Sequence, residues 1–419
     1  MQKLHAVLRP LLPALLAVLA ACAPLMPTSP PPEKEGGAAC PTCPACPVCP
    51  PPPVVTPSVP PSPQPFVRHY VPAVWADLPG WQDDDHAAAW TAFLSSCRGM
   101  ASRPHGAAWK SVCDQARTAG PLAENAPAAR QFFEKHLRPY AVLSGDGKAE
   151  GMVTGYYEPL LRGSRHAQKG FEQPVRGVPD DLLTIDLSAL FPELKDKRVR
   201  GRLEGNKVVP YWSRAEIQSR GERLPAKTLL YVDDAVELFF LQVQGSGRVR
   251  LPDGSMVRLN YADQNGHPYQ SIGRVLIERG ELKLEDASMQ GIQAWARANP
   301  ARLNELLNAN PSYVFFRELP DSKVGPQGAL GVPLTAERSI AIDPRAIPLG
   351  APVFLATTRP NSVQALQRLV LAQDTGGAIK GAVRADFFWG FGREAGEQAG
   401  RMKQSGRYWL LWPQGIAPK

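Results

Sequence analysis

The sequence lacks the motifs of several common enzyme classes. It has no HExxH segment, and its seven histidines are scattered, so a zinc protease is not expected. It has no GxSxG segment, so the nucleophile elbow of the α/β hydrolases is missing. The glycines of GGAIKG are spaced as in a phosphate-binding loop, but Ala382 and Val383 follow where that loop needs Lys and Ser or Thr.

The sequence also lacks the signs of a nucleic-acid-binding protein. Its formal net charge is +8, without a basic block, and no aromatic-plus-basic RNA-binding motif occurs. The part of the chain after the proline-rich stretch has no internal repeat. A mild positive charge suits an anionic polymer of the cell envelope better than nucleic acid, so we expect no nucleic acid as a partner.

The start of the chain is typical of a lipoprotein precursor. A charged stretch precedes an apolar run over Leu11–Ala20 that is too short to span a bilayer. The Leu-Ala-Ala-Cys that ends at Cys22 resembles the lipobox of bacterial lipoproteins. It implies a signal peptide over 1–21 and a Cys22 that carries lipid, with an acyl chain such as palmitate on its amine. Ala23, in place of Asp, implies anchoring in the outer membrane facing the periplasm. The alternative is an ordinary signal peptide with Cys22 incidental.

Residues 22–72 form a linker rich in proline and cysteine. It has 17 prolines among the 42 residues from Pro24 to Pro65, so it cannot bury a core and should adopt extended polyproline II. Four of its cysteines recur every third residue, namely Cys40, Cys43, Cys46 and Cys49. In polyproline II neighbouring cysteines would lie about 9 Å apart, beyond the roughly 7 Å limit for a disulfide, which also argues against a zinc knuckle. Disulfides between chains, bridges after local kinking and inert cysteines all stay open, as does pairing of Cys97 with Cys113.

The remaining residues, about 350, are enough for two domains. Residues near 83–140 have the apolar period of helices, as in DHAAAWTAFLSSC and PAARQFFEKHL. Short strand-like runs follow in GMVTGYYEPLL, KVVPYW, TLLYVDD and ELFFLQVQGSGRVRL, then in SIAIDP, APVFLAT, RLVLAQD, RADFFWG and RYWLLWP. One helical pair, SMQGIQAWARAN and PARLNELLNAN, separates the two sets. The sequence therefore predicts a mainly β protein with an N-terminal helical layer, of the α+β class.

Two aspartates stand in the glycine-rich and aromatic stretch AQDTGGAIKGAVRADFFWG. Asp374 begins a DTG turn, and Asp386 precedes three aromatic rings. Apolar surroundings raise the pKa of a carboxyl, whereas the hydroxyl and amides after Asp374 favour the charged form. Asp386 is therefore the candidate general acid and Asp374 an auxiliary group. DTG also marks aspartic proteases, but these need two such aspartates, so a protease would have to dimerise.

Amide and tyrosine side chains supply candidate sugar contacts. In LFFLQVQGSGR, the alternation of a strand would put Gln242 and Gln244 on one face, where amides could bind hydroxyl or acetamido groups. Tyr156, Tyr157 and Glu158 combine flat rings with a polar group, as carbohydrate grooves do. A solvated sheet face and a pair of core tyrosines are the respective alternatives.

From about Tyr140 to Pro413 the chain resembles the membrane-bound lytic murein transglycosylase A family. The resemblance rests on VTGYYEPLL, LFFLQVQGSGR, YADQNGHPYQSIGR, NPSYVFFRE, GALGVPLTAERSIAIDPRAIPLG and QDTGGAIKGAVRADFFWG, in this order. It implies a double-psi β-barrel domain over about 75–158 plus 320–416. It also implies a second, β-barrel-like domain inserted over 159–319, with a glycan groove between the two. The linker lies outside the resemblance.

The resemblance also implies roles for particular residues. Asp343, Asp374 and Asp386 would form a three-aspartate domain, with Asp386 as general acid/base, Asp374 as auxiliary group and Asp343 as a structural residue. No metal site is implied. The expected substrate contacts are Thr154, Tyr156, Tyr157, Glu158, Gln242, Gln244, Ser246, Gly247, Gly376 and Lys380.

The activity so implied is that of a peptidoglycan lytic exotransglycosylase, a lyase, although no residue distinguishes exo from endo action. It would cleave the β-1,4 bond between N-acetylmuramic acid and N-acetylglucosamine and give 1,6-anhydromuramoyl products. Hydrolytic glycosidases need two carboxylates, but here the attacking C6 hydroxyl is tethered, which can replace about 7–11 kcal/mol of the barrier. One acid then suffices, without metal or cofactor. A cell-wall enzyme complex is a candidate partner. The alternatives are a non-catalytic peptidoglycan-binding lipoprotein and, less favoured, a dimeric DTG protease.

Overall fold

The computed structural model describes residues 68–194, 197, 199–322 and 324–418. All of them belong to one structural unit, Pro63–Lys419. The signal peptide, Cys22 and nearly all of the linker lie outside the described residues, so what was predicted for them stays a prediction. Within the described part of the chain, no helix combines the length and apolar character that crossing a bilayer requires.

Six strands close into a barrel, which confirms the predicted mainly β fold. In order around the barrel they are β17 (Lys403–Pro413), β14 (Pro352–Thr358), β15 (Ala365–Thr375), β13 (Ser339–Ile342), β16 (Arg384–Phe391) and β3 (Glu150–Glu158), and β3 pairs back with β17. The pairings β13–β15 and β16–β3 are parallel, and the other four are antiparallel. Beyond β17 the sheet continues into β2 (Leu137–Leu143) and β1 (His69–Pro72).

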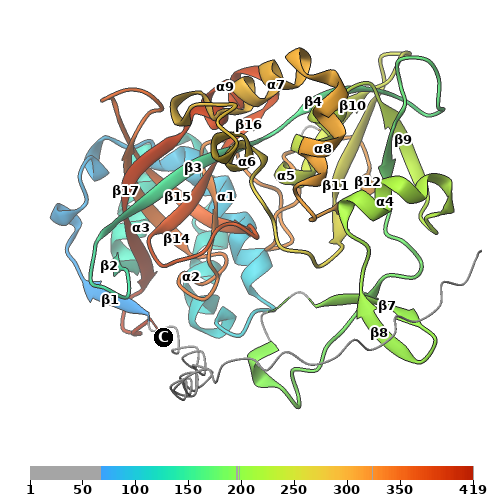
Figure 1. The fold of residues 1–419 in the computed structure, drawn as a ribbon. Helices are drawn as coiled ribbons and strands as arrows, with labels where there is room; N and C mark the ends of the chain where they lie inside the picture. The colour runs from blue at the N-terminus through green and yellow to red at the C-terminus, as the bar shows by residue number, and fades with distance from the viewer. Residues whose placement is uncertain (1–67, 195–196, 198, 323, 419) are drawn as a thin grey trace, which may run out of the picture. The chain divides into compact units, whose positions relative to one another are not determined.

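Three helices pack against this barrel, as the N-terminal pattern predicted (Figure 1). They are α1 (His86–Met100), α2 (Gly106–Thr118) and α3 (Ala126–His136). Asp85 caps α1 and Asn125 caps α3, each accepting a hydrogen bond from a main-chain N–H of the first turn. One cluster of buried apolar side chains spans the helices and the barrel, so the two layers share a core. The disulfide Cys97–Cys113 joins α1 to α2, which decides a pairing that the sequence left open.

A second six-stranded sheet lies between β3 and β13 in the chain. Its order is β12 (Val314–Leu319), β11 (Met256–Gln264), β10 (Ser246–Arg250), β4 (Leu160–Ser164), β9 (Thr228–Val232) and β5 (Gln173–Arg176). The edge strands β12 and β5 contact each other, so the sheet curls towards a barrel. A separate apolar cluster holds α5 (Ala235–Gln244), α6 (Ile272–Glu278), α7 (Met289–Ala298) and α8 (Leu303–Asn308) together beside it (Figure 1).

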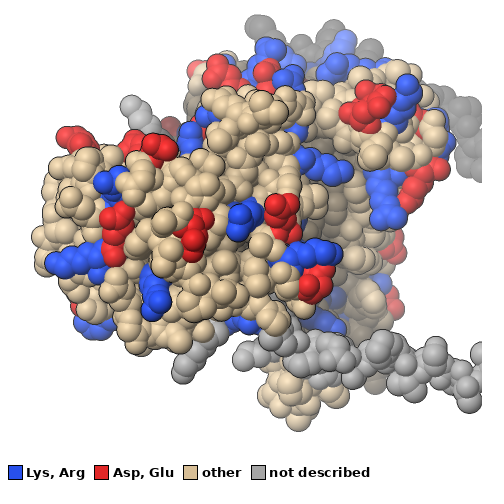
Figure 2. All heavy atoms as spheres, turned by 90° about the vertical axis from the view of Figure 1, so that its left-hand side faces the viewer, with Lys and Arg blue, Asp and Glu red and all other residues tan. Residues whose placement is uncertain are grey.

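The remaining elements are small. A three-stranded sheet of β6 (Leu183–Thr184), β7 (Arg200–Glu204) and β8 (Lys207–Pro210) follows β5, and α4 (Arg214–Arg220) comes after it. Helix α9 (Gly392–Arg401) packs on β3. The 3-10 segments are Trp75–Asp77, Trp81–Asp83, Leu122–Glu124, Pro192–Leu194, Gly221–Arg223, Leu284–Asp286 and Pro300–Arg302. On the face that Figure 2 presents, basic and acidic side chains are interspersed without a patch of one sign.

The prediction of a strand over LFFLQVQ is wrong, because these residues form the last turns of α5. The Asp234 carboxylate caps the helix by accepting from the N–H groups of Val236 and Glu237 at 2.7 and 3.0 Å. Gly245 ends it in the left-handed conformation, with φ of 79°. The helix is buried on several sides, so its apolar residues are nearly continuous and show no helical period. Gln242 and Gln244 are about 200° apart around it and do not share a face.

Candidate active site

The barrel holds Asp374 and Asp386 at one level. Asp374 on β15 and Asp386 on β16 both pair with Ala341 of the intervening strand β13. Since neighbouring strands lie about 4.8 Å apart, the two Cα atoms lie within about 10 Å of each other. The register of three strands therefore brings together two acids that stand twelve positions apart in the chain.

Asp386 lies beside the hydroxyl of Thr154, which the guanidinium of Arg384 holds in place. In the parallel pairing of β16 with β3, Asp386 is opposite Thr154, whose Oγ1 donates to Asp386 Oδ1 at 2.6 Å. Arg384 Nη2 donates in turn to Thr154 Oγ1 at 2.8 Å. Burial raises the pKa of Asp386 to about 6, with Asp374 adding to the rise, although the Thr154 hydroxyl and the Arg384 charge both act to lower it. Asp386 is therefore able to carry a proton near neutral pH.

The apolar surroundings of Asp386 come only partly from the three rings that follow it. Side chains of successive strand residues point to opposite faces, so Phe388 shares the face of Asp386 while Phe387 and Trp389 point away. Phe387 and Trp389 belong to the main barrel core. Phe388 packs against Tyr156, with ring centroids 5.2 Å apart, in a small apolar cluster that includes Ala341.

Asp374 is an acceptor for three donors. Its Oδ2 accepts from the Tyr156 hydroxyl at 3.1 Å, and its Oδ1 accepts from the N–H groups of Ala329 and Thr375, each at 2.9 Å. Burial and the charges of both aspartates hold the pKa of Tyr156 well above its usual value, so the phenol stays a donor. Asp374 thus ties β3 and the loop of Ala329 to the end of β15.

Asp343 lies at the end of β13 and organises the backbone. Burial acts to raise its pKa, but hydrogen bonds from the Arg345 side chain and from the N–H groups of Gly381 and Arg345 hold it below its usual value. The bidentate contacts to Arg345 measure 3.0 and 2.6 Å, and the one to Gly381 N–H measures 2.9 Å. These bonds fix the segment before Arg384, which leads into β16.

Several of the predicted sugar contacts meet where β3 joins the second sheet. The Tyr157 N–H donates to Gln244 Oε1 at 3.1 Å, and its phenol lies 3.6 Å from Met289 Sδ. Glu158 is buried and pairs with Arg248 Nε at 3.0 Å; burial raises the pKa of Glu158 against the opposing Arg248 charge. Ser246 and Gly247 are buried at the start of β10.

The other predicted contacts are dispersed. Gln242 is only 4 % exposed, and its Oε1 has no hydrogen-bond partner among the described residues. Gly376 is half-buried against Ile379, and Lys380 is exposed in the same loop after β15. The structure therefore gathers Thr154 and Tyr156 around the aspartates, and leaves Gln242 apart from Gln244.

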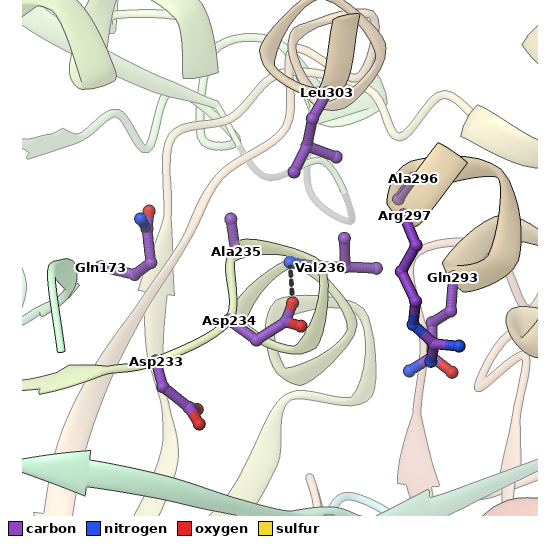
Figure 3. A pocket seen from close by; sticks show the side chains of 9 residues that line it. All are labelled: Gln173, Asp233, Asp234, Ala235, Val236, Gln293, Ala296, Arg297 and Leu303. Atoms are coloured by element: carbon purple, nitrogen blue, oxygen red, sulfur yellow. Dashed lines mark hydrogen bonds between the residues drawn. The ribbon is translucent and has the colours of Figure 1, made fainter. Parts of the chain in front are cut away.

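Two cavities of the described residues lie away from the two aspartates. One, of about 300 Å³, lies at the start of α5, where the Asp234 carboxylate turns back to the N–H of Val236 (Figure 3). The other, of about 760 Å³, lies beside Asp84 and Arg338. Neither is lined by Asp374 or Asp386, so neither is the predicted glycan groove.

Sequence reasoning missed two arginines that contact the predicted site residues, Arg384 and Arg248. Arg384 stands two residues before Asp386, so strand alternation alone would have placed both on one face. Arg248 likewise follows Ser246 by two residues. Its guanidinium also lies 4.6 Å from the centre of the Phe391 ring at the end of β16, which links β10 to the barrel.

Comparison with known proteins agrees with this architecture. Residues 152–317 match the family description "MltA specific insert domain" and residues 338–412 match "3D domain". The membrane-bound lytic murein transglycosylase A of Escherichia coli K12 is 38% identical over 290 residues, which cover 67% of this chain and 70% of that protein. The crystal structure of MltA from Neisseria gonorrhoeae, in its monoclinic form, is 41% identical with a TM-score of 0.74, covering 85% of this chain and 97% of that one. E. coli MltA with bound chitohexaose is 30% identical with a TM-score of 0.58, covering 85% and 95%. The chain therefore belongs to the membrane-bound lytic murein transglycosylase A family.

Proposed function

We propose that this protein is a lytic transglycosylase of peptidoglycan in which Asp386 alone acts as general acid and then as general base. The observation that carries the proposal is the environment of Asp386. Its carboxyl is half-buried beside an apolar cluster, and the pKa of this carboxyl is raised to about 6. A general acid works best when its pKa lies near the working pH.

The reaction needs two proton transfers at one carboxyl. Protonated Asp386 gives its proton to the oxygen that leaves with N-acetylglucosamine as the C1–O bond of N-acetylmuramic acid breaks. The resulting carboxylate takes the proton of the C6 hydroxyl while O6 bonds to C1. The sugar becomes a 1,6-anhydro ring, Asp386 is protonated again, and no water enters. Because the nucleophile belongs to the same sugar, its attack avoids much of the entropic cost of a bimolecular step.

Asp374 has an auxiliary role in this proposal. Its charge helps to keep Asp386 protonated. The hydrogen bonds that it accepts hold Tyr156 and the Ala329 loop in position. Asp343 is structural, since its oxygens bind Arg345 and the N–H of Gly381.

We place the glycan strand in a groove between a barrel domain, 75–158 plus 320–416, and an inserted domain, 159–319. Two facts support this: a relative binds chitohexaose, and Tyr157 and Gln244 meet where β3 leaves the barrel. The remaining contacts that we assign to the groove are Thr154, Tyr156, Glu158, Ser246, Gly247, Gly376 and Lys380. Gln242 is left out, because it lies about 200° around α5 from Gln244, the glutamine that contacts Tyr157.

Cleavage of isolated sacculi tests the activity itself. We expect the purified protein to release soluble 1,6-anhydro muropeptides, detected by mass spectrometry. A non-catalytic peptidoglycan-binding lipoprotein would bind the sacculi and release none. A dimeric DTG protease would leave them intact, cleave peptide substrates and be inhibited by a statine-type peptide.

Attachment to the outer membrane is proposed from the lipobox-like sequence before Cys22 and from the membrane-bound family. We expect Cys22→Ala to abolish partition with membranes, because a lipid chain on that sulfur would be the anchor. Membrane fractionation, with the mass of the wild-type N-terminal peptide as a control for lipid, checks this. Unchanged partition together with an unmodified Cys22 would refute the anchor.

A further inference from the structure

Three side chains on two strands form a hydrogen-bonded row that ends on the proposed acid. Arg384 and Asp386 share one face of β16, and Thr154 stands opposite Asp386 on β3. The row runs from Arg384 Nη2 to Thr154 Oγ1 at 2.8 Å, and from Thr154 Oγ1 to Asp386 Oδ1 at 2.6 Å. A second donor of Arg384 binds the carbonyl oxygen of Ala385, which holds the guanidinium against the strand.

The donors and acceptors in this row determine the direction of each hydrogen bond. A guanidinium has only donors, so the oxygen of Thr154 accepts from Arg384 and its single proton cannot point back. That proton therefore points to Asp386 Oδ1, which becomes an acceptor in either protonation state. Oδ2 has no hydrogen-bond partner among the described residues. The carbonyl oxygen of a carboxylic acid is its better acceptor, so the acid proton belongs on Oδ2.

We infer that Arg384 is a positioning residue that, through Thr154, assigns the catalytic proton to Oδ2 of Asp386. The inference rests on the proposed function, because it matters only if Asp386 transfers that proton. Oδ2 then both protonates the leaving oxygen and receives the proton of the C6 hydroxyl, so one oxygen serves the two half-steps without rotation of the carboxyl.

The charges around Asp386 determine how its titration should respond. Arg384 on β16 and the Thr154 hydroxyl on β3 favour the carboxylate, whereas Asp374 on β15 disfavours it. Tyr156 on β3 and Tyr408 on β17 also lie near, and burial raises the pKa of both above its usual value, so they stay neutral while Asp386 titrates. Removing Arg384 or the Thr154 hydroxyl should therefore raise the pKa of Asp386.

The test compares Thr154→Val, Arg384→Met and the double variant with wild type, using kcat/KM for release of 1,6-anhydro muropeptides as a function of pH. Each single change should lower kcat/KM by roughly tenfold to a hundredfold, the effect of losing a hydrogen bond to a charged group. Activity needs the protonated acid, so the alkaline limb of each profile should move to higher pH. The double variant should be little slower than the slower single variant, since Arg384 acts through Thr154.

Two further variants serve as controls. Thr154→Ser keeps the hydroxyl, so it should recover a large part of the rate that Thr154→Val loses and return the alkaline limb towards its wild-type position. Arg407→Met removes an exposed arginine of β17 that contacts the Trp409 ring, and should leave both unchanged. Chitohexaose binding and circular dichroism monitor folding, and if Thr154→Val does not fold, the Arg384→Met profile decides alone.

The outcomes separate this inference from the proposed function. Lower rates with an unmoved alkaline limb, or independent and additive losses, would overturn the role of Arg384 while Asp386 stays the acid. Full activity of Asp386→Asn would instead overturn the proposed function, and the inference with it.

Discussion

Replacement of Asp386 by Asn should abolish most of the activity. Asn is nearly the same size and keeps a hydrogen-bonding group, but it has no acidic proton at neutral pH. Loss of general acid catalysis lowers rates by about 10²–10⁴-fold, and the loss here should reach or exceed that range, because one residue serves both half-steps. Turnover on glycan strands, measured with saturating substrate, checks the expectation.

Asp374→Asn is the matched control for that experiment. It should reduce turnover less, since Asp374 tunes and positions without transferring the proton, and both variants should still bind chitohexaose. A DTG protease predicts a different pattern, in which the two Asn variants are equally inactive. Near-normal turnover by Asp386→Asn would remove the acid from the mechanism.

Asp84→Asn should markedly lower the free energy of unfolding. The Asp84 carboxylate accepts from Arg338 Nη1 at 2.9 Å and from the N–H of Leu369 at 2.7 Å. The two charged side chains are 3% and 6% exposed. Breaking such a pair leaves a buried charge unpaired and costs about 3–5 kcal/mol. We expect a loss of about 3 kcal/mol, because Arg338 keeps its bond to the carbonyl oxygen of Leu369.

Asp83→Asn, one position earlier, controls for the substitution. Asp83 is exposed, so its replacement should change the free energy of unfolding by less than about 0.5 kcal/mol. Denaturant titration with a common m-value measures both variants. Equal midpoints would mean that the ion pair does not hold the segment before α1 to the barrel.

The sequence predicted the barrel well because its strands keep a local signature. SIAIDP, APVFLAT and RADFFWG each became a barrel strand, and the N-terminal helices have clear apolar faces and caps. The helix α5 was mistaken for a strand because a short helix buried on several sides has no visible period. Helices α4, α6 and α9 were missed; α9 packs through Ala395, Gly396 and Ala399, which carry little hydrophobic signal.

The candidate site was predictable to a similar degree. The neighbours of Asp386 in the chain indicated apolar surroundings, but only Phe388 of the three rings shares its face, and Phe388 packs against Tyr156 on β3, a strand far away in the sequence. Strand pairing decides such contacts, and pairing of β16 with β3 joins residues 232 positions apart. The Thr154–Asp386 bond follows from strand register, which a single sequence does not reveal. Two of the donors on Asp374, the Tyr156 hydroxyl and the Ala329 N–H, come from segments distant in the chain.

Digestion of purified glycan strands in water enriched in oxygen-18 tests the central claim most directly. If Asp386 directs attack by the C6 hydroxyl of the same sugar, the new muramoyl ends will be 1,6-anhydro rings that carry no oxygen-18. A hydrolytic mechanism would place one oxygen-18 atom at C1 of each new reducing end. Label at C1 in the products of the wild-type protein would contradict the account.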